Sequence, residues 1–426
     1  MEPVHIGMLC LAAVLGLIAL RVPIAVSLLT VSFAGLYFIA GERVAFSLLT
    51  TVPYHTTASW TLSSVPMFLL MGYVAYHSGL TRGLFEAARV WLGRLPGGLV
   101  IASLAGAGGF SAVTGSSLAC SAAIGRIAIP EMRRNGYDLR IAAGSVAAGG
   151  TLGALIPPSI LLIIFGIQAQ VSITALFFGG MIVGLISLAF YVAATLVVYA
   201  IWPQSLPRAA AVPSGERLRA TLQIWPVLVL VAGVFGGLFS GLFTATEAGA
   251  FGAFLAIVIG IARRTLTWRG FSASCVDTLL SSGALFIIAV AANLFSRLIA
   301  MSGLSAEMSG FVAGLGLDAF WLLVIISLIY VMLGLFLEPL GAMLLTLPLF
   351  LPMLGPHGVD LIWFGILVAK LLEIGMITPP VGLNVFVIHS VAKDYVRLEQ
   401  IFVGILPFLI ADVVLVVLML VTRGMF

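Results

Sequence analysis

Long apolar segments recur along this chain and constrain its fold more than any other feature. Two of them, residues 176–200 and 401–420, are long enough to cross a bilayer, because its hydrocarbon layer needs roughly 20 apolar residues per helix. Hydrophobic residues make up 62% of the sequence and charged residues only 8%, which leaves too little charge to coat a water-exposed surface. A membrane barrel would show short alternating segments instead. The sequence therefore predicts an all-α polytopic membrane protein.

The apolar segments indicate about ten to twelve helical passes. Two further stretches, about 97–130 and 320–352, are interrupted midway by polar, Gly or Pro residues, and the only long hydrophilic connection is 203–220. The continuous segments lie near 6–20, 24–40, 61–80, 139–170, 174–201, 222–240, 243–262, 272–300, 360–391 and 400–422.

Several classes are disfavoured by the residues that are missing or scattered. The three cysteines, Cys10, Cys120 and Cys275, lie far apart in apolar sequence, which argues against a disulfide framework or a metal cluster. The N-terminus has no basic region before an apolar one, so we expect no signal peptide. A phosphate-binding loop is absent, so we expect no ATP hydrolysis. Nucleic acid is not an expected partner.

The basic residues predict which side of the membrane is cytoplasmic, because cytoplasmic loops collect Arg and Lys. If both interrupted stretches enter and leave on one face, 16 of the 20 basic residues fall on one side. Arg43 and Arg423 then fall on the other side, and Arg297 and Lys370 lie in or near the hydrocarbon. Two full crossings would break up this bias, so the charges favour two re-entrant helical hairpins. The 16 residues are Arg21, Arg82, Arg89, Arg94, Arg126, Arg133, Arg134, Arg140, Arg208, Arg217, Arg219, Arg263, Arg264, Arg269, Lys393 and Arg397.

The second half of the chain repeats part of the first at a constant offset of 222 residues. Seven identities fall within residues 130–158 without a gap, and a weaker match of Ala25 with Ala248 extends the repeat. Chance matching of common residues is the alternative. Residues 131–139 contain two arginines, whereas the matching loop 353–361 contains no Lys or Arg. Matching loops of opposite charge character predict an inverted-topology repeat, which is common in secondary transporters. The matched residues are Pro130, Gly136, Asp138, Leu139, Gly153, Pro157 and Pro158 with Pro352, Gly358, Asp360, Leu361, Gly375, Pro379 and Pro380.

Each half also contains two places where a helix must break. One is a hairpin tip, at 111–117 and at 337–341, and the other is a proline doublet, at 157–158 and at 379–380. Adjacent prolines remove amide donors and push the preceding residue out of helical geometry. Unsatisfied backbone groups in hydrocarbon persist only where they line a cavity or bind something. We therefore expect two unwound, discontinuous transmembrane helices.

These breaks are the predicted binding sites. Freed carbonyls and hydroxyls are suitable ligands for Na⁺, and helix N-termini suit a carboxylate. The alternative is that the hydroxyls only allow close helix packing. The candidates are Ser111, Thr114, Gly115, Ser116 and Ser117 at the first tip; Gly153, Ile156 and Pro157 at the first break; Glu338, Pro339 and Gly341 at the second tip; and Gly375, Thr378, Pro379, Gly382 and Asn384 at the second break.

Four charged residues within predicted spans have open roles. Lys370 and Glu373 lie three apart on one helical face, where they form either a structural pair or an ion-coupling pair. Glu247 is expected to cap the helix that it begins. Glu338 is the strongest acidic candidate for contact with a cation or substrate.

Several motifs together resemble the large membrane (M) subunit of TRAP transporters, the tripartite ATP-independent periplasmic family. They run in the expected order through essentially the whole chain. The motifs are GSSLACSAAIGRIAIPEMRRNGYD at 115–138, LGALIPPSI at 152–160, TATEA at 244–248 and EIGMITPPVGLN at 373–384.

The resemblance implies Na⁺-coupled import of organic acids such as C4-dicarboxylates or sialic acid. It implies two protein partners, a small four-helix membrane subunit and a periplasmic binding protein, and a place in a bacterial or archaeal cytoplasmic membrane. No cofactor is implied, and Na⁺ is the coupling ion. One Na⁺ site then pairs the first tip with 153–157, and the other pairs residues 338–341 with 375–379, with substrate between the tips. The family often has a shorter acid where Glu338 stands, and small residues where Cys120 and Arg126 stand.

The resemblance also implies an elevator mechanism, in which a transport domain carrying both hairpins moves against a scaffold. The predicted scaffold segments are 1–80, 172–300 and 393–426. The predicted transport segments are 81–171, with the first hairpin and break, and 301–392, with the second hairpin and break.

Two alternatives to this function differ in what they require. A stand-alone Na⁺/dicarboxylate symporter of similar hairpin architecture would work without a binding protein. An intramembrane enzyme would need paired catalytic acids, and the aspartates, Asp277 and Asp412 included, are expected at helix ends or in loops. We therefore expect no enzymatic activity, and the repeat disfavours a channel.

Overall fold

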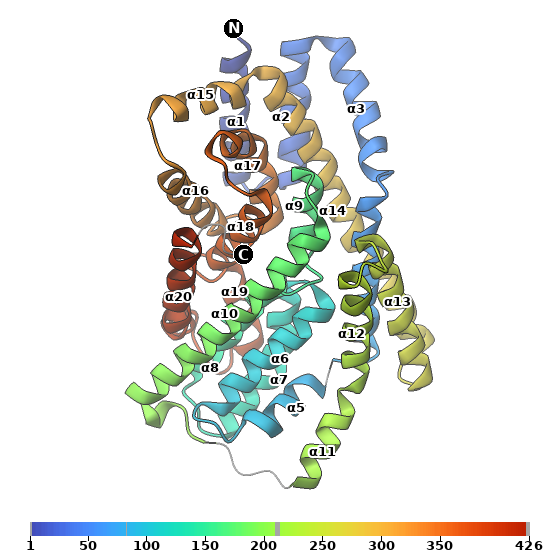
Figure 1. The fold of residues 1–426 in the computed structure, drawn as a ribbon, viewed down its shortest axis with the longest axis vertical. Coiled ribbons are helices and arrows are strands. Elements are labelled where there is room, and N and C mark those ends of the chain that lie inside the picture. Colours follow the sequence, from blue (N-terminus) through green and yellow to red (C-terminus); the bar gives the residue numbers. More distant parts are fainter. Residues whose placement is uncertain (1, 82, 209–213, 423–426) are drawn as a thin grey trace.

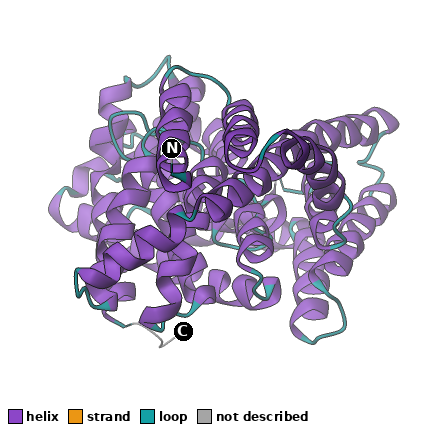
Figure 2. Ribbon diagram, turned by 90° about the horizontal axis from the view of Figure 1, so that it is seen from above, coloured by secondary structure: helices purple, strands orange, loops and turns teal. Residues whose placement is uncertain are grey.

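The regular elements are all helical in the computed structural model, which describes residues 2–81, 83–208 and 214–422 (Figure 1). Arg82 and Arg423, two residues of the orientation argument, lie outside the described residues. Figure 2 shows the helices packed side by side when seen from above.

The α-helices are α1 (Pro3–Ala19), α2 (Ile24–Ala40), α3 (Glu42–Thr57), α4 (Ser64–His77), α5 (Gly83–Leu92), α6 (Gly98–Thr114), α7 (Ser117–Arg134), α8 (Leu139–Gly150), α9 (Ile160–Ala169), α10 (Ile173–Ile201), α11 (Ser214–Gln223), α12 (Trp225–Phe239), α13 (Ala245–Ala262), α14 (Trp268–Ser302), α15 (Leu304–Gly314), α16 (Ala319–Gly334), α17 (Pro339–Leu354), α18 (Leu361–Gly375), α19 (Leu383–Ala392) and α20 (Leu398–Val421). Short 3₁₀ turns are η1 (Thr61–Ser63), η2 (Thr151–Ala154), η3 (Pro203–Ser205) and η4 (Gly355–His357).

Five helices of the described chain are long and apolar enough to cross a membrane, or seven if two bent helix pairs each count as one span. The expected ten to twelve passes exceed this number, because the segments 139–170 and 360–391 are divided into shorter helices and because α1 and α2, with 17 residues each, are shorter than these spans. The hydrophilic connection predicted at 203–220 is not wholly a connection, because its last residues belong to α11. Both proline doublets interrupt helices as predicted: one lies between η2 and α9, and the other between α18 and α19.

The repeat extends through the helices far beyond the matched residues. Helices α7 and α17 begin at 117 and 339, and α8 and α18 begin at 139 and 361, so both pairs keep the offset of 222 residues. The packing repeats as well: α8 packs on α20 as α18 packs on α10, and α2 packs on α14 as α13 packs on α4. Each half therefore supplies helices that cover the other half.

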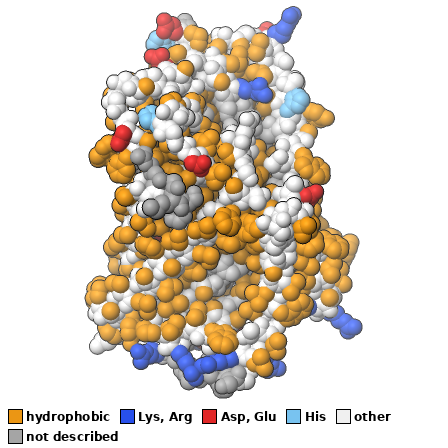
Figure 3. Space-filling model, in the orientation of Figure 1, with side chains coloured by type: hydrophobic (Ala, Val, Ile, Leu, Met, Phe, Trp, Pro, Cys, Tyr) orange, Lys and Arg blue, Asp and Glu red, His pale blue; other side chains and the backbone are white. Residues whose placement is uncertain are grey.

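The surface separates apolar sides from a basic end. In Figure 3 hydrophobic side chains cover much of the visible face, and Lys and Arg gather at the lower end, where Figure 1 places α5 and α11. Large apolar side chains such as Phe38 (75% exposed) and Trp268 (81% exposed) lie on the outside. This distribution fits a chain whose sides face lipid and whose basic end faces the cytoplasm.

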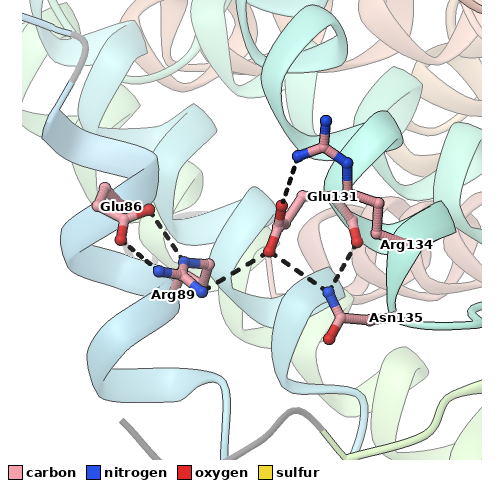
Figure 4. A network of polar contacts seen from close by, with 5 residues as sticks. All are labelled: Glu86, Arg89, Glu131, Arg134 and Asn135. Atoms are coloured by element: carbon pink, nitrogen blue, oxygen red, sulfur yellow. Dashed lines mark hydrogen bonds and ion pairs between the residues drawn. The ribbon is translucent and has the colours of Figure 1, made fainter. Parts of the chain in front are cut away.

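An ionic network fastens α5 to the C-terminal end of α7 (Figure 4). Arg89 lies between Glu86 of its own helix and Glu131 of α7, 3.6 Å from the Glu131 carboxylate. Asn135 Nδ2 donates to the Glu131 carbonyl oxygen at 2.9 Å. Glu247, which was expected to cap its helix, accepts from the Thr244 backbone N–H at 2.8 Å and completes a capping box, as predicted.

A fully buried polar network joins α18, α20 and α10. Lys370 Nζ donates to Asp412 Oδ1 at 2.6 Å, and the Tyr191 hydroxyl donates to Asp412 Oδ2 at 2.8 Å. Lys370 is therefore paired with Asp412 rather than with Glu373. The prediction for the aspartates was also wrong at two positions, because Asp412 lies inside α20 and Asp277 inside α14.

Candidate functional site

Both hairpin tips border one cavity of about 430 Å³. Residues 114–117 line it from the first tip, and residues 338–340 line it from the second. Glu373 and Met376 contribute from the end of α18 and its cap. The structure thus brings together the two tips, which are more than 220 residues apart in the sequence.

The first tip is shaped by Gly115 and Ser116. Gly115 ends α6 in the left-handed region, at a φ of 62°, where a side chain would also collide with the Pro158 carbonyl oxygen. Only glycine fits this turn without strain. Ser116 then caps α7 by accepting from the Ala119 backbone N–H at 3.4 Å. The N-terminal end of α7 consequently lies at the cavity.

The first break packs directly behind this tip, as predicted. A Cβ on Gly153 would lie 2.8 Å from the Ser117 backbone nitrogen. Ser159 bridges the gap before α9: its hydroxyl donates to the Ala154 carbonyl at 2.6 Å. Ile156 and Pro157 are buried but do not line the cavity, and neither does Ser111, whose hydroxyl donates to the Ala107 carbonyl of its own helix at 2.7 Å.

The second tip lies at the same cavity but differs from the first tip in its side chains. Glu338 caps α17 without a side-chain bond to the helix backbone, and Pro339 follows it as the first helical residue. Both residues line the cavity. Gly341 does not, since it faces Ile24 of α2. Gly375 packs closely on Gly334, at the end of α16, where a Cβ on Gly375 would lie 2.5 Å from the Gly334 backbone. The second break is thereby held against the second hairpin.

The rest of the second break lies away from the cavity. The Thr378 hydroxyl donates to the Ile374 carbonyl oxygen at 2.6 Å. Pro379 is exposed, and Gly382 adopts the left-handed conformation with a φ of 62°. Asn384 was expected to line the cavity, but it is fully buried elsewhere, and its side-chain amide atoms have no hydrogen-bond partner among the described residues. None of the described cavity-lining residues comes from 377–384.

Several cavity residues were not among the predicted site residues. Tyr73 and Tyr76 come from α4, and Ser281 comes from α14; the hydroxyl oxygens of Tyr73 and Ser281 lie 2.7 Å apart. Tyrosine hydroxyls in an otherwise apolar helix were the available signal, because a buried phenol needs a partner. Arg126 of α7 also lines the cavity, although the charge pattern grouped it with the cytoplasmic arginines.

The charges in the cavity have opposite signs but do not pair. Among the described lining residues Arg126 is the basic one, and Glu338 and Glu373 are the acidic ones. No ion pair within the described chain involves Arg126 or Glu338. Ser117 Oγ donates to Glu373 Oε1 at 2.6 Å and links the first tip to α18. The described residues contain no group of three or more His, Cys, Asp or Glu side chains that could hold a metal ion, so an ion here would depend on carbonyl and hydroxyl oxygens as well.

A helical chain with apolar sides, two repeated halves and a cavity bordered by charged and hydroxyl side chains belongs to the class of multi-pass membrane transporters. Its fold is similar to that of the YdaH transporter of Alcanivorax borkumensis, with a TM-score of 0.65, 16% identity and 89% of each chain covered. MtrF of Neisseria gonorrhoeae is similar with a TM-score of 0.62, 15% identity, and coverage of 100% of this chain and 96% of that one.

The sequence narrows the class to one family. Residues 11–425 match the family model of the tripartite ATP-independent periplasmic transporter, DctM component, so the chain belongs to this family and is a TRAP large permease. The C4-dicarboxylate TRAP transporter large permease protein DctM of Pseudomonas aeruginosa is 35% identical over 345 residues, 79% of either chain. The isethionate TRAP transporter permease protein DctMQ of Oleidesulfovibrio alaskensis is 32% identical over 95% of this chain, which spans only 62% of that protein's length.

Proposed function

We propose that this chain is the large subunit of a Na⁺-coupled transporter that imports organic acids across a bacterial cytoplasmic membrane. Relatives named for C4-dicarboxylate and isethionate transport support an acidic substrate. So does the cavity, where the N-terminal ends of α7 and α17 and the side chain of Arg126 attract anions. The meeting of both tips at this cavity is the observation that carries the proposal.

Coupling to cations follows from the charge of the same cavity. Glu338 and Glu373 would repel an incoming anion, and Arg126 balances only one of them. Bound Na⁺ removes this repulsion, so that acid and ions bind together. One Na⁺ site is formed by the first tip with the break at 153–157, and the other by the second tip with the break at 375–379. The contacts of Gly153 with Ser117 and of Gly375 with Gly334 support this pairing.

The position of the cavity, between proposed scaffold segments and the hairpins, also supports an elevator mechanism. Tyr73 and Ser281 belong to the proposed scaffold segments 1–80 and 172–300, and they face hairpin residues across the cavity. In the proposed mechanism, both hairpins move with the substrate against this scaffold, and the two halves have inverted topology. A small membrane subunit supports the scaffold, and a periplasmic binding protein delivers the acid.

Uptake by the reconstituted complex tests the proposal. Proteoliposomes with both membrane subunits and the binding protein should take up at least one of succinate, sialic acid and isethionate, only with an inward Na⁺ gradient. Net positive charge movement gains about 2.3 kcal/mol per charge per 100 mV. Two Na⁺ ions moved with a monoanion such as isethionate carry one net positive charge, so an inside-negative potential should speed the uptake of such an acid. Uptake that ignores Na⁺, or no uptake of any of the three acids, contradicts the proposal. Uptake without the binding protein favours the stand-alone symporter.

A further inference from the structure

Glu373 is a buried acid that belongs to neither of the two proposed tip sites. It lies in the last turn of α18, is 1% exposed, and borders the cavity between the two tips. Removal of a carboxylate from water is costly unless the group is paired or neutralised. Its surroundings must therefore supply a partner for it.

The described residues provide a partner for only one of its oxygens. Ser117 donates to Oε1 at 2.6 Å, whereas Oε2 has no hydrogen-bond partner in the described part of the chain. Lys370, one turn earlier on α18, is directed to Asp412 instead, at 2.6 Å. The remaining charged residues at the cavity are Glu338, which has the wrong sign, and Arg126, which makes no ion pair with Glu373. Oε2 is thus a free acceptor at the border of a cavity.

Three features around this oxygen favour a cation. The carboxylate is an oxygen ligand of the kind that hard cations prefer. The Ser117 hydroxyl still has lone pairs to offer after it donates its proton. Helix α18 ends two residues later at Gly375, and the C-terminal end of a helix carries partial negative charge. A proton on Glu373 would satisfy only one carboxylate oxygen. A Na⁺ ion can be bound by the carboxylate, the Ser117 hydroxyl and the C-terminal end of α18 at the same time.

We propose that Glu373 and Ser117 form a further cation site, which holds one Na⁺ between the two tip sites. The inference rests on the proposed function and adds one ion to it. Ser117 belongs to the first hairpin and Glu373 to the helix before the second break, so this ion would link the two halves of the chain.

The number of Na⁺ ions moved per acid tests this site. In proteoliposomes with the complete complex, the Na⁺ gradient at which the net flux of the acid is zero, measured at fixed pH and fixed membrane potential, gives this number for the acid that the wild type transports. Glu373→Gln keeps the size of the side chain and an oxygen that accepts from Ser117, but it removes the charge. We expect this variant to move one Na⁺ fewer per acid. Glu373→Asp keeps the charge and should keep the number, with a half-saturating Na⁺ concentration raised about tenfold.

Asp394→Asn is the matched control, because Asp394 is an exposed acid outside the cavity, and it should behave as the wild type. If Glu373→Gln does not transport, stabilisation of the purified complex by Na⁺ against heat replaces the measurement, and the variant should lose part of the wild-type response. An unchanged ion number or an unchanged stabilisation overturns the site, as does a variant that loses only the pH dependence of uptake. Wild-type uptake without Na⁺ would instead overturn the proposed function.

Discussion

At the residue scale, Arg126 is the basic side chain among the described residues that line the cavity. It lies ten residues after the cap of α7, about 15 Å along the helix, and its side chain leans back toward the N-terminus as helical side chains do. An acid with an anionic group at each end could therefore bind the first amides of α7 at one end and the guanidinium at the other.

Substitution of Arg126 should weaken acid binding. Loss of a charge-assisted hydrogen bond costs about 1.5–3 kcal/mol, so we expect Arg126→Gln to raise the dissociation constant of a dicarboxylate at least about tenfold. Calorimetry with succinate on the purified membrane subunits in Na⁺ measures this change. Arg134→Gln is the control, because Arg134 is exposed on the same helix but outside the cavity. Equal affinities in both variants would show that the acid does not reach Arg126.

The sequence predicted the cavity-lining tip residues better than the residues that face them. Gly115 and Ser116 combine a helix-ending glycine with a helix-capping serine, so the turn follows from local chemistry. Arg126 could not be placed from charge counting, since the count gives a side of the membrane but not a helix face. Asn384 was misplaced for a related reason. It lies one helical turn beyond Pro380, so the direction of its side chain depends on how the chain leaves the break.

At the scale of elements, the proline doublets determine where the broken helices end. Contacts between residues far apart in the sequence determine how these helices are placed. Asp138 and Asp360 cap α8 and α18 through the backbone N–H groups of Arg140 and Trp363. These ends were predictable from neighbouring residues. The pairing of Lys370 with Asp412 was not, because the two residues are 42 positions apart and belong to different helices.

The Lys370–Asp412 pair should behave as an interdependent unit. Removal of one partner of a buried ion pair costs about 3–5 kcal/mol, whereas replacement of both by apolar residues costs much less. We expect Lys370→Met and Asp412→Leu each to lower the thermal unfolding temperature of the detergent-purified chain by several degrees, and the double variant to recover most of the loss. Additive losses in the double variant would mean that the pair does not hold α18 against α20.

At the scale of the whole molecule, the two halves have the same arrangement of helices, and helices of each half pack on helices of the other half. The constant offset between α7 and α17 and between α8 and α18 shows that the repeat covers hairpins and breaks alike. The reciprocal packing of α8 on α20 and of α18 on α10 interlocks the halves. Such an exchange follows naturally if a pseudo-two-fold axis lies in the membrane plane, which places matching loops on opposite sides.

Matched cysteines in the repeated loops test this inversion. Arg134 and Pro356 occupy equivalent positions at the offset of 222 residues, and both are exposed. In a variant with Cys10, Cys120 and Cys275 replaced, a membrane-impermeant thiol reagent added outside intact cells should label Pro356→Cys but not Arg134→Cys. Inverted membrane vesicles should reverse the pattern, because the arginine-rich loop is cytoplasmic by the charge rule. Labelling of both cysteines from one side would mean that the halves share one orientation, and the two proposed Na⁺ sites would then not be related by inversion.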